Sequence, residues 1–413
     1  MAIDADSALR QAGRRDIRRL AELWTHAFPG ERTVEQRVRQ LEEGGVYGGI
    51  EQAWYIERNG RIAGAFRGYA LTQYLHGAPV PMLGLAAVAV AADARRSGLG
   101  GRLCAAAVRI GRERGDLVSV LYPFRPDFYH RLGWGLAGSL HAHRFAPEAL
   151  PVQVGHPRVY LAPASLLPAV FECYDAVARS SHGLLQRTPA VWRQHLAREV
   201  HHIHALQDGA VVRGYLMVAY GPGPVPDRKT LVVQELIARD DDARAELLSW
   251  ISLQRDSWRV VAYDALPEER FDLLLAEPRP FGYRPRRTLW APTARIIRGP
   301  MLRLLDVPGA LEARSAWPET APLRFTLTVR DPLLPENEGP WQVDFDGRQV
   351  RCTRAGAAPV ELHTDAATLA QIHAGELRVS EAARFGRAAV RGPTAPLDAL
   401  FQAGRTLRLL DEF

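Results

Sequence analysis

Hydrophobic residues near the start of the chain recur with a helical period. Ile17, Leu20, Leu23, Trp24 and Phe28 share one face of a helix over this stretch. Apolar strand-like runs follow, and an Asn-Gly turn within residues 57–60 joins the first two as a hairpin. The pattern predicts strands at residues 53–56, 62–70, 82–90 and 117–122, with a helix at residues 99–113 before the last strand.

A second stretch repeats this order of elements. It starts with a hairpin closed by an Asp-Gly turn and continues with a strand, a helix and a strand. The predicted elements are residues 202–206, 211–218, 230–238, 243–253 and 258–264. We interpret the stretch as a duplicated, degenerate copy of the first. An unrelated α/β domain is the alternative.

A third stretch follows a proline-rich segment, residues 283–308. It alternates apolar and polar residues and then turns helical, which is an α+β pattern. The predicted strands are residues 323–329, 341–345 and 349–353, and the predicted helices are residues 366–374, 380–384 and 396–402. We therefore expect three domains, at residues 1–150, 151–298 and 299–413.

Composition narrows the class of protein. The 413 residues are 47% hydrophobic and 24% charged, as in a globular protein, and the net charge is +6. The positive charge is spread along the chain as arginine, with Lys229 the only lysine, so we expect no nucleic-acid partner. No run approaches the roughly 18 to 20 apolar residues of a membrane span, and the acidic start lacks a secretory signal. We expect a cytoplasmic protein without a membrane partner.

The three cysteines, Cys104, Cys173 and Cys352, lie far apart in the sequence. None of them has the spacing of a metal ligand, and an odd number argues against a disulfide framework. Each is expected to be a small buried residue, and we expect no metal site.

A basic, glycine-rich turn follows the strand at residues 82–90 and leads into a helix. Bare main-chain N–H groups and a helix N-terminus then meet at one point, which suits a phosphate. Small neighbours on the strand leave room for an extended pantetheine arm. The predicted cofactor contacts are Val88, Ala89, Val90, Arg95, Arg96, Ser97, Gly98, Leu99, Gly100 and Gly101. A Rossmann dinucleotide site needs a different glycine spacing.

The corresponding turn of the second stretch has no glycine. It contains Asp240, Asp241 and Asp242, which suit a helix dipole and repel phosphate. If the two stretches are copies, the second has lost the phosphate site.

The spacing Arg95-x-x-Gly98-x-Gly100 resembles the cofactor motif of the GNAT N-acetyltransferases. The resemblance implies acetyl-CoA as co-substrate. It also covers residues 127–135, where Tyr129 stands in the position of the family's general acid. A phenol has a reference pKa of about 10 and can protonate a departing thiolate. A purely structural tyrosine at a helix end is the alternative for Tyr129, and His130 is the second candidate for the acid.

The order of the three stretches resembles the enhanced intracellular survival (Eis) acetyltransferases. These combine an active GNAT domain, a degenerate one and a sterol-carrier-like domain. The last stretch resembles that domain at Trp341, Asp346-Gly347, Leu369, Gly375-Glu376, Phe385-Gly386 and Leu400-Phe401. The resemblance implies a tandem α/β GNAT fold followed by an α+β domain. It also implies a homohexamer.

The Eis resemblance extends to the end of the printed chain. Family members end in a phenylalanine whose α-carboxylate is the general base, which implies that role for Phe413. It implies cofactor contacts for Phe124 and Arg125, and acceptor contacts for Trp24, Phe28 and Glu412. The best-known member of the family lines its acceptor pocket with acidic residues from the first helix region, whereas residues 23–28 here are neutral and aromatic, so the acceptor stays open.

These observations predict transfer of acetyl from acetyl-CoA to a primary amine. The acceptor would be a cationic small molecule, aminoglycoside-like or a polyamine, or a lysine side chain. Two alternatives stay open: a carrier that binds lipid or acyl groups in the third domain, and a regulator that binds acyl-CoA without turnover.

Overall fold

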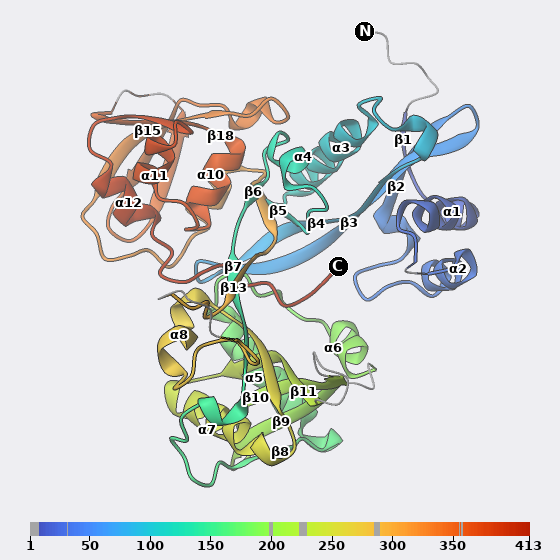
Figure 1. Ribbon diagram of the computed structural model, residues 1–413. Helices are drawn as coiled ribbons and strands as arrows, with labels where there is room; N and C mark the ends of the chain where they lie inside the picture. Colours follow the sequence, from blue (N-terminus) through green and yellow to red (C-terminus); the bar gives the residue numbers. More distant parts are fainter. Residues whose placement is uncertain are drawn as a thin grey trace. The chain divides into compact units, whose positions relative to one another are not determined.

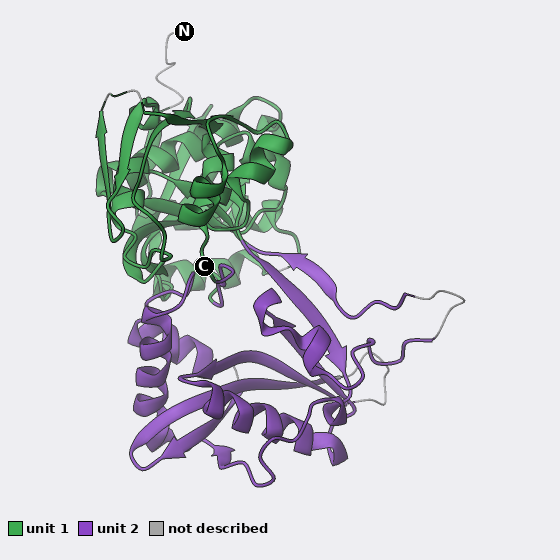
Figure 2. Ribbon diagram, turned by 90° about the vertical axis from the view of Figure 1, so that its left-hand side faces the viewer, with its two compact units in different colours: residues 1–137, 300–404, 411–413 green, residues 138–299, 405–410 purple. Residues whose placement is uncertain are grey.

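The computed structural model describes residues 8–30, 32–197, 201–222, 229–284, 290–354, 356 and 358–413. Two compact units make up the chain (Figure 2). Unit 1 contains residues 1–137, 300–404 and 411–413, and unit 2 contains residues 138–299 and 405–410. Each unit is therefore assembled from segments that are distant in the sequence.

The first sheet of unit 1 has seven strands in the order β1-β2-β3-β4-β5-β14-β6 (Figure 1). β4 and β5 run parallel, and the other neighbours are antiparallel. The strands are β1 Leu9–Gln11, β2 Ala53–Arg58, β3 Arg61–Leu75, β4 Ala78–Val90, β5 Val118–Leu121, β6 Gly135–Leu136 and β14 Met301–Leu304. Asn59 and Gly60 close the β2–β3 hairpin with φ of +50° and +71°, which confirms the predicted turn.

Helices cover both faces of this sheet. They are α1 Ile17–Ala27, α2 Val34–Glu43, α3 Leu99–Arg114 and α4 Pro126–His130. One buried cluster joins Leu20 of α1 to Ala65 of β3. The other joins Leu103 of α3 to Phe66 and Leu83. Successive strand residues point to opposite faces of a sheet, so Ala65 packs in the cluster with α1 and Phe66 packs in the cluster with α3.

The second sheet of unit 1 has the order β17-β16-β15-β18-β19. Its strands are β15 Leu323–Arg330, β16 Trp341–Phe345, β17 Val350–Arg354, β18 Val360–Asp365 and β19 Ala388–Arg391, and its helices are α9 Val307–Glu312, α10 Ala366–His373, α11 Val379–Arg384 and α12 Ala395–Phe401. Gln371 of α10 donates to the Leu136 carbonyl of the first sheet at 2.9 Å. Arg303 of β14 and Asp331, both buried, form an ion pair at 2.5 Å.

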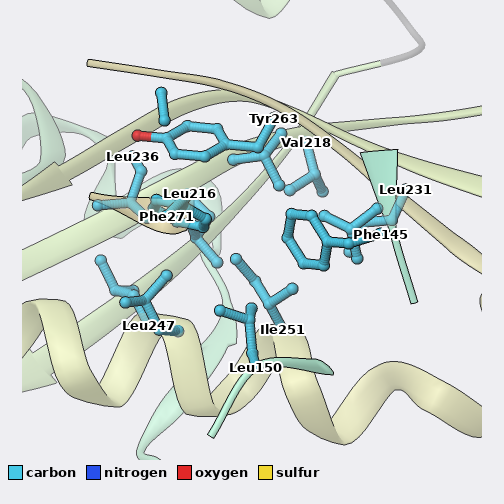
Figure 3. Close-up of a cluster of buried hydrophobic side chains, with 14 of the residues drawn as sticks. Phe145, Leu150, Leu216, Val218, Leu231, Leu236, Leu247, Ile251, Tyr263 and Phe271 are labelled. Atoms are coloured by element: carbon cyan, nitrogen blue, oxygen red, sulfur yellow. The ribbon is translucent and has the colours of Figure 1, made fainter. Parts of the chain in front are cut away.

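Unit 2 contains a seven-stranded sheet with the order β13-β7-β12-β11-β10-β9-β8. The strands are β7 Ser139–Phe145, β8 Val159–Leu161, β9 His201–Asp208, β10 Val211–Pro222, β11 Lys229–Ala238, β12 Val260–Ala265 and β13 Arg295–Arg298. The helices are α5 Leu167–Arg179, α6 Pro189–Leu196, α7 Asp241–Ser252 and α8 Phe271–Leu274. Figure 3 shows the core, where Leu247 and Ile251 of α7 pack against Leu216 and Leu231 of the sheet.

Three strands depart from the simple order that the sequence predicts. β14 lies within the proline-rich segment and joins the first sheet of unit 1, whereas β13 and β7 join the sheet of unit 2. The sheet of unit 2 thus includes β7, which precedes residue 150, and the first sheet of unit 1 includes β14, which follows residue 298. The domain boundaries at residues 150 and 298 remain a prediction. Among the described residues, no helix is long and apolar enough to cross a membrane.

Candidate active site

The basic turn lies where a phosphate could reach it. Arg95, Arg96, Ser97 and Gly98 are exposed, and Gly98 has a φ of +78° immediately before α3. A Cβ atom at Gly98 would meet open space, so the main chain there is accessible. Within the described part of the chain, neither arginine has an ion-pair partner. Two cationic groups and the unpaired amides of the first helical turn are therefore available to an anion.

β4 changes its pairing beside this turn. Its parallel pairs with β5 run from Met82–Val118 to Gly84–Val120, and β4 then continues to Val90. A bulge interrupts its pairing with β3, since Ala65 pairs with Ala89 but Arg67 pairs with Ala86. Ala87 has a φ of +50° at this bulge. Ala87 and Val88 are thus left out of the regular pairing with β3, whereas Ala89 and Val90 pair with Ala65 and Gly64.

Trp24 holds the bulge in place. Its indole Nε1 donates to the Ala87 carbonyl at 2.8 Å, and its side chain is buried. The carbonyl of one residue and the N–H of the next point in opposite directions in a trans peptide. The Val88 N–H therefore points away from α1, as a donor for developing negative charge would need to.

Tyr129 of α4 is buried among aromatic rings. Its ring lies 5.0 Å from Phe128, 5.7 Å from Phe124 and 6.1 Å from Trp134. It belongs to the core cluster on the α3 face, together with Leu83 and Cys104. Burial, assisted by Cys104, raises the pKa of the Tyr129 phenol. The hydroxyl therefore keeps its proton at neutral and moderately alkaline pH.

The other candidate residues after β5 lie near the surface. Phe124 is 66% exposed. Arg125 is exposed and pairs with Asp127 at 2.9 Å. His130 Nε2 lies 3.3 Å from Arg387, and burial, followed by that guanidinium, lowers the pKa of His130.

Phe413 lies against the centre of the first sheet. A Cβ atom at Gly84 would lie 3.0 Å from the Phe413 ring, so this glycine makes the close approach possible. The Phe413 ring also contacts three tyrosines, Tyr122 at 5.9 Å, Tyr47 at 6.3 Å and Tyr69 at 6.5 Å between centroids. Tyr122 donates to the Asp411 carbonyl at 3.1 Å. The end of the chain is therefore held beside the last β4–β5 pair.

A buried arginine lies next to this aromatic cluster. The Arg67 guanidinium stacks over Tyr69 at 4.9 Å and donates to the carbonyls of Gly48 and Gly49 at 3.0 Å each. Burial raises the pKa of Tyr69, and the arginine opposes that rise. None of Tyr47, Arg67, Tyr69, Gly84 and Tyr122 belongs to a sequence motif that predicts this site. The one local signal was the glycine inside an otherwise apolar strand.

Tyr129 and Phe413 lie on opposite faces of β4. Leu83 and Leu85 face the cluster that holds Tyr129, whereas the intervening Gly84 faces Phe413. The two groups thus flank the place where β4 and β5 separate. Trp24 reaches the same strand from α1, while Phe28 is half-buried with Arg37 over its ring at 5.9 Å, and Glu412 is exposed.

Comparisons with known protein families agree with this architecture. Residues 8–137 and residues 183–304 match two models of the acetyltransferase (GNAT) domain. Residues 307–407 match the sterol carrier protein domain.

Individual relatives span most of the chain. An uncharacterized N-acetyltransferase of Streptomyces avermitilis is 28% identical over 307 residues, which cover 67% of this chain and 68% of that protein. The N-acetyltransferase Eis of Mycobacterium tuberculosis is 28% identical over 324 residues, which cover 75% and 74%. The crystal structure of a GCN5-related N-acetyltransferase from Anabaena variabilis superposes with a TM-score of 0.81 at 23% identity, over 98% of this chain and 100% of that one.

Proposed function

Since this chain belongs to the Eis-like GNAT N-acetyltransferases, we propose that it transfers the acetyl group of acetyl-CoA to a primary amine, with Tyr129 as general acid and Phe413 as general base. One observation carries the proposal: Tyr129 and Phe413 lie on opposite faces of β4, beside the last β4–β5 pair. A donor and an acceptor that meet at this point would have a proton donor on one side and a proton acceptor on the other.

The residues of the basic turn fit the diphosphate of coenzyme A. Arg95 and Arg96 would supply charge, and the amides of Ser97, Gly98, Leu99, Gly100 and Gly101 would supply hydrogen bonds. The open space beside Gly98 is the feature that permits a close approach. Val88, Ala89 and Val90 would pair with the pantetheine amides, as an added strand does. Phe124 and Arg125, exposed just after β5, are proposed as further contacts.

Acetyl-CoA supplies an activated acyl group as a thioester. The Phe413 α-carboxylate would accept a proton from the attacking amine, and Tyr129 would donate its phenolic proton to the leaving sulfur. The Val88 N–H, oriented by the Trp24–Ala87 hydrogen bond, would stabilise the negative charge on the carbonyl oxygen in the transition state. Trp24 thus has a positioning role in this proposal besides the acceptor contact predicted for it.

The acceptor proposed is a cationic small molecule, aminoglycoside-like or a polyamine, or a lysine side chain. Phe28, Trp24 and the exposed Glu412 are its proposed contacts, and the tyrosines around Phe413 offer faces for an ammonium group. Assembly as a homohexamer and a cytoplasmic location remain predictions.

The test measures release of the coenzyme A thiol against a panel of polyamines, aminoglycosides and lysine peptides. Native protein, verified by intact mass to end at Phe413, is compared with a variant that carries one glycine after Phe413. The extended variant moves the carboxylate by one residue and is expected to lose about 100-fold in kcat with an unchanged KM for acetyl-CoA. Full activity of the extended variant would exclude the terminal carboxylate as the base. Absence of turnover with every amine would exclude the proposed reaction.

A further inference from the structure

Residues 405–410 belong to unit 2, although the three residues after them belong to unit 1. Within unit 2, the Thr406 N–H donates to Glu268 Oε1 at 2.8 Å, and the Arg408 N–H donates to the His182 carbonyl at 2.9 Å. The Arg405 guanidinium donates to the Ser180 carbonyl at 3.3 Å. This segment is therefore fixed at three points immediately before the chain reaches Phe413.

Two glycines make room for the same segment. A Cβ atom at Gly138 would lie 2.5 Å from the Leu407 carbonyl oxygen, and one at Gly183 would overlap the main chain of Arg408. Both glycines have positive φ, +127° and +115°, which a side chain would also disfavour. Leu407 itself is buried. Unit 2 is thus shaped closely around residues 407 and 408.

The Arg408 side chain lines the same cavity as Arg244 and Glu269, two charged residues of unit 2. Burial alone would lower the pKa of Arg408, but the nearby Tyr263, Glu269 and Glu235 outweigh that effect and raise it. Tyr263 donates to Glu269 at 3.0 Å, and Arg244 pairs with Glu269 at 2.6 Å. Charged groups in a low-dielectric interior hold one another firmly when they are paired.

The segment also lines a cavity of about 620 Å³ in unit 2. The wall of this cavity includes Leu236–Ala238 at the end of β11 and Asp240, Asp241 and Arg244 at the start of α7. That place corresponds to the basic turn of the first GNAT domain. The cofactor end of the degenerate domain is therefore lined by the chain's own tail.

We propose that the degenerate GNAT domain holds residues 405–408 so that Phe413 is delivered to the acetyl-transfer site, with Arg408 as the principal positioning residue. The inference rests on the proposed function, in which Phe413 supplies the base. A chain end is ordinarily poorly ordered. Anchoring the tail a few residues before Phe413 restricts the positions of the carboxylate and thereby raises the fraction of productive geometry.

The test uses the full-length protein and the variants Arg408→Ala and Glu268→Ala. Arg408→Ala is expected to lower kcat about 10- to 100-fold and Glu268→Ala about threefold, both with unchanged KM for acetyl-CoA. Amide hydrogen exchange of residues 411–413 should rise in both. Glu277→Ala removes an exposed carboxylate of unit 2 that pairs with Arg279 and not with the tail, and it should change neither quantity.

A double-mutant cycle separates positioning from a structural effect. In protein lacking Phe413, Arg408→Ala should cause no further loss of kcat, because the group that it positions is absent. The proposal would be overturned if the fold-losses of kcat from Arg408→Ala and from removal of Phe413 multiplied in the double variant. Unchanged amide exchange of residues 411–413 in Arg408→Ala would also overturn it. If Arg408→Ala fails to fold, Glu268→Ala provides the same cycle. Full activity of the protein lacking Phe413 would instead overturn the terminal base, and the exchange of the tail amides would still decide whether unit 2 holds the tail.

Discussion

The two GNAT-like domains share an arrangement of strands and helices and differ in the side chains at corresponding positions. In the first domain, β4 pairs with antiparallel β3 and runs parallel to β5, and a bulge at Ala87 interrupts the pairing of β4 with β3. In the second domain, β11 pairs with antiparallel β10 and runs parallel to β12, and a bulge between Val233 and Glu235 interrupts the pairing of β11 with β10. Each strand then leads into a helix. The fold alone therefore does not make a cofactor site.

The turns before the two helices have opposite electrostatics. The first turn has a left-handed Gly98 and two exposed arginines. In the second, the Asp240 carboxylate accepts from the Ala243 N–H at 2.8 Å and also pairs with Arg213. A side chain of the domain thus satisfies the helix N-terminus that a phosphate would otherwise occupy.

The residues after the two bulges also differ. Val88 lies in the first bulge and Val90 follows it, and both are half-buried. Glu235 follows the second, where it pairs with Arg187 at 2.5 Å and accepts from Tyr215 at 2.8 Å. Both partners of the ion pair are almost fully buried. At the position that corresponds to the proposed cofactor strand, the second domain therefore has a closed group of polar side chains.

The largest expected effect comes from giving the first turn the charge of the second. Arg95→Asp with Arg96→Asp should raise the Kd for acetyl-CoA about 1,000-fold, roughly 4 kcal/mol, because two charge-assisted phosphate contacts are lost. Isothermal titration calorimetry measures the Kd. Arg255→Asp with Arg259→Asp, exposed in unit 2, makes the same change in net charge and should leave the Kd within twofold. Equal weakening by both pairs would show that only net charge matters.

Next in size is the loss of the buried pair in the second domain. Glu235→Ala leaves Arg187 buried without its counterion, so we expect the free energy of unfolding of unit 2 to fall by about 3 to 4 kcal/mol. Calorimetric unfolding measures this change. Glu277→Ala, at an exposed pair, should cost under about 0.5 kcal/mol. A similar small cost for Glu235→Ala would contradict the view that this buried ion pair stabilises the second domain.

A comparison of two buried tyrosines gives the third effect. Tyr129→Phe should lower kcat about 100-fold, roughly 2.7 kcal/mol, because the proton donor is lost. Tyr174→Phe removes a buried hydroxyl of unit 2 that donates to the Leu185 carbonyl at 2.8 Å, and kcat should stay within twofold. Since burial raises the pKa of Tyr129, native kcat/KM for acetyl-CoA should show no loss from its ionisation up to pH 10. Wild-type kcat in Tyr129→Phe would remove the phenol from the mechanism.

The smallest effect is a pH dependence confined to unit 2. Burial, followed by His202, lowers the pKa of His204 to about 4. The His204 ring contacts Trp250 at 4.3 Å. The neutral form is the one that fits, so this contribution to stability is complete above the unfolded-state pKa of about 6.5 and is lost as pH falls from there toward 4. Between pH 7 and pH 5, unit 2 should lose about 2 kcal/mol.

Calorimetry of His204→Phe at the same two pH values tests this assignment. The variant cannot take up the proton, so most of the difference between pH 7 and pH 5 should disappear. An unchanged difference would assign the acid sensitivity to other groups.

Local chemistry explains which parts of the site were predictable. The Asn59–Gly60 hairpin, the strand before Arg95 and the helix after Gly98 all follow from short-range pattern, and the structure confirms them. The membership of β14 in the first sheet was not predictable, because its partners β5 and β6 are more than about 160 residues away. Trp24 has a helical apolar signature, and only the structure shows that its indole N–H fixes the Ala87 carbonyl.

The sequence by itself determined the turn for which we propose coenzyme A binding. The residues Arg95–Gly101 combine flexible glycine main chain, arginine charge and the start of a helix. These features act within a few residues of one another, so the sequence is enough to predict them. Only the tertiary structure decided the surroundings of Phe413. Gly84, Tyr47, Tyr69 and Tyr122 come from separate elements, and they meet at the chain end because a folded sheet brings distant residues into contact.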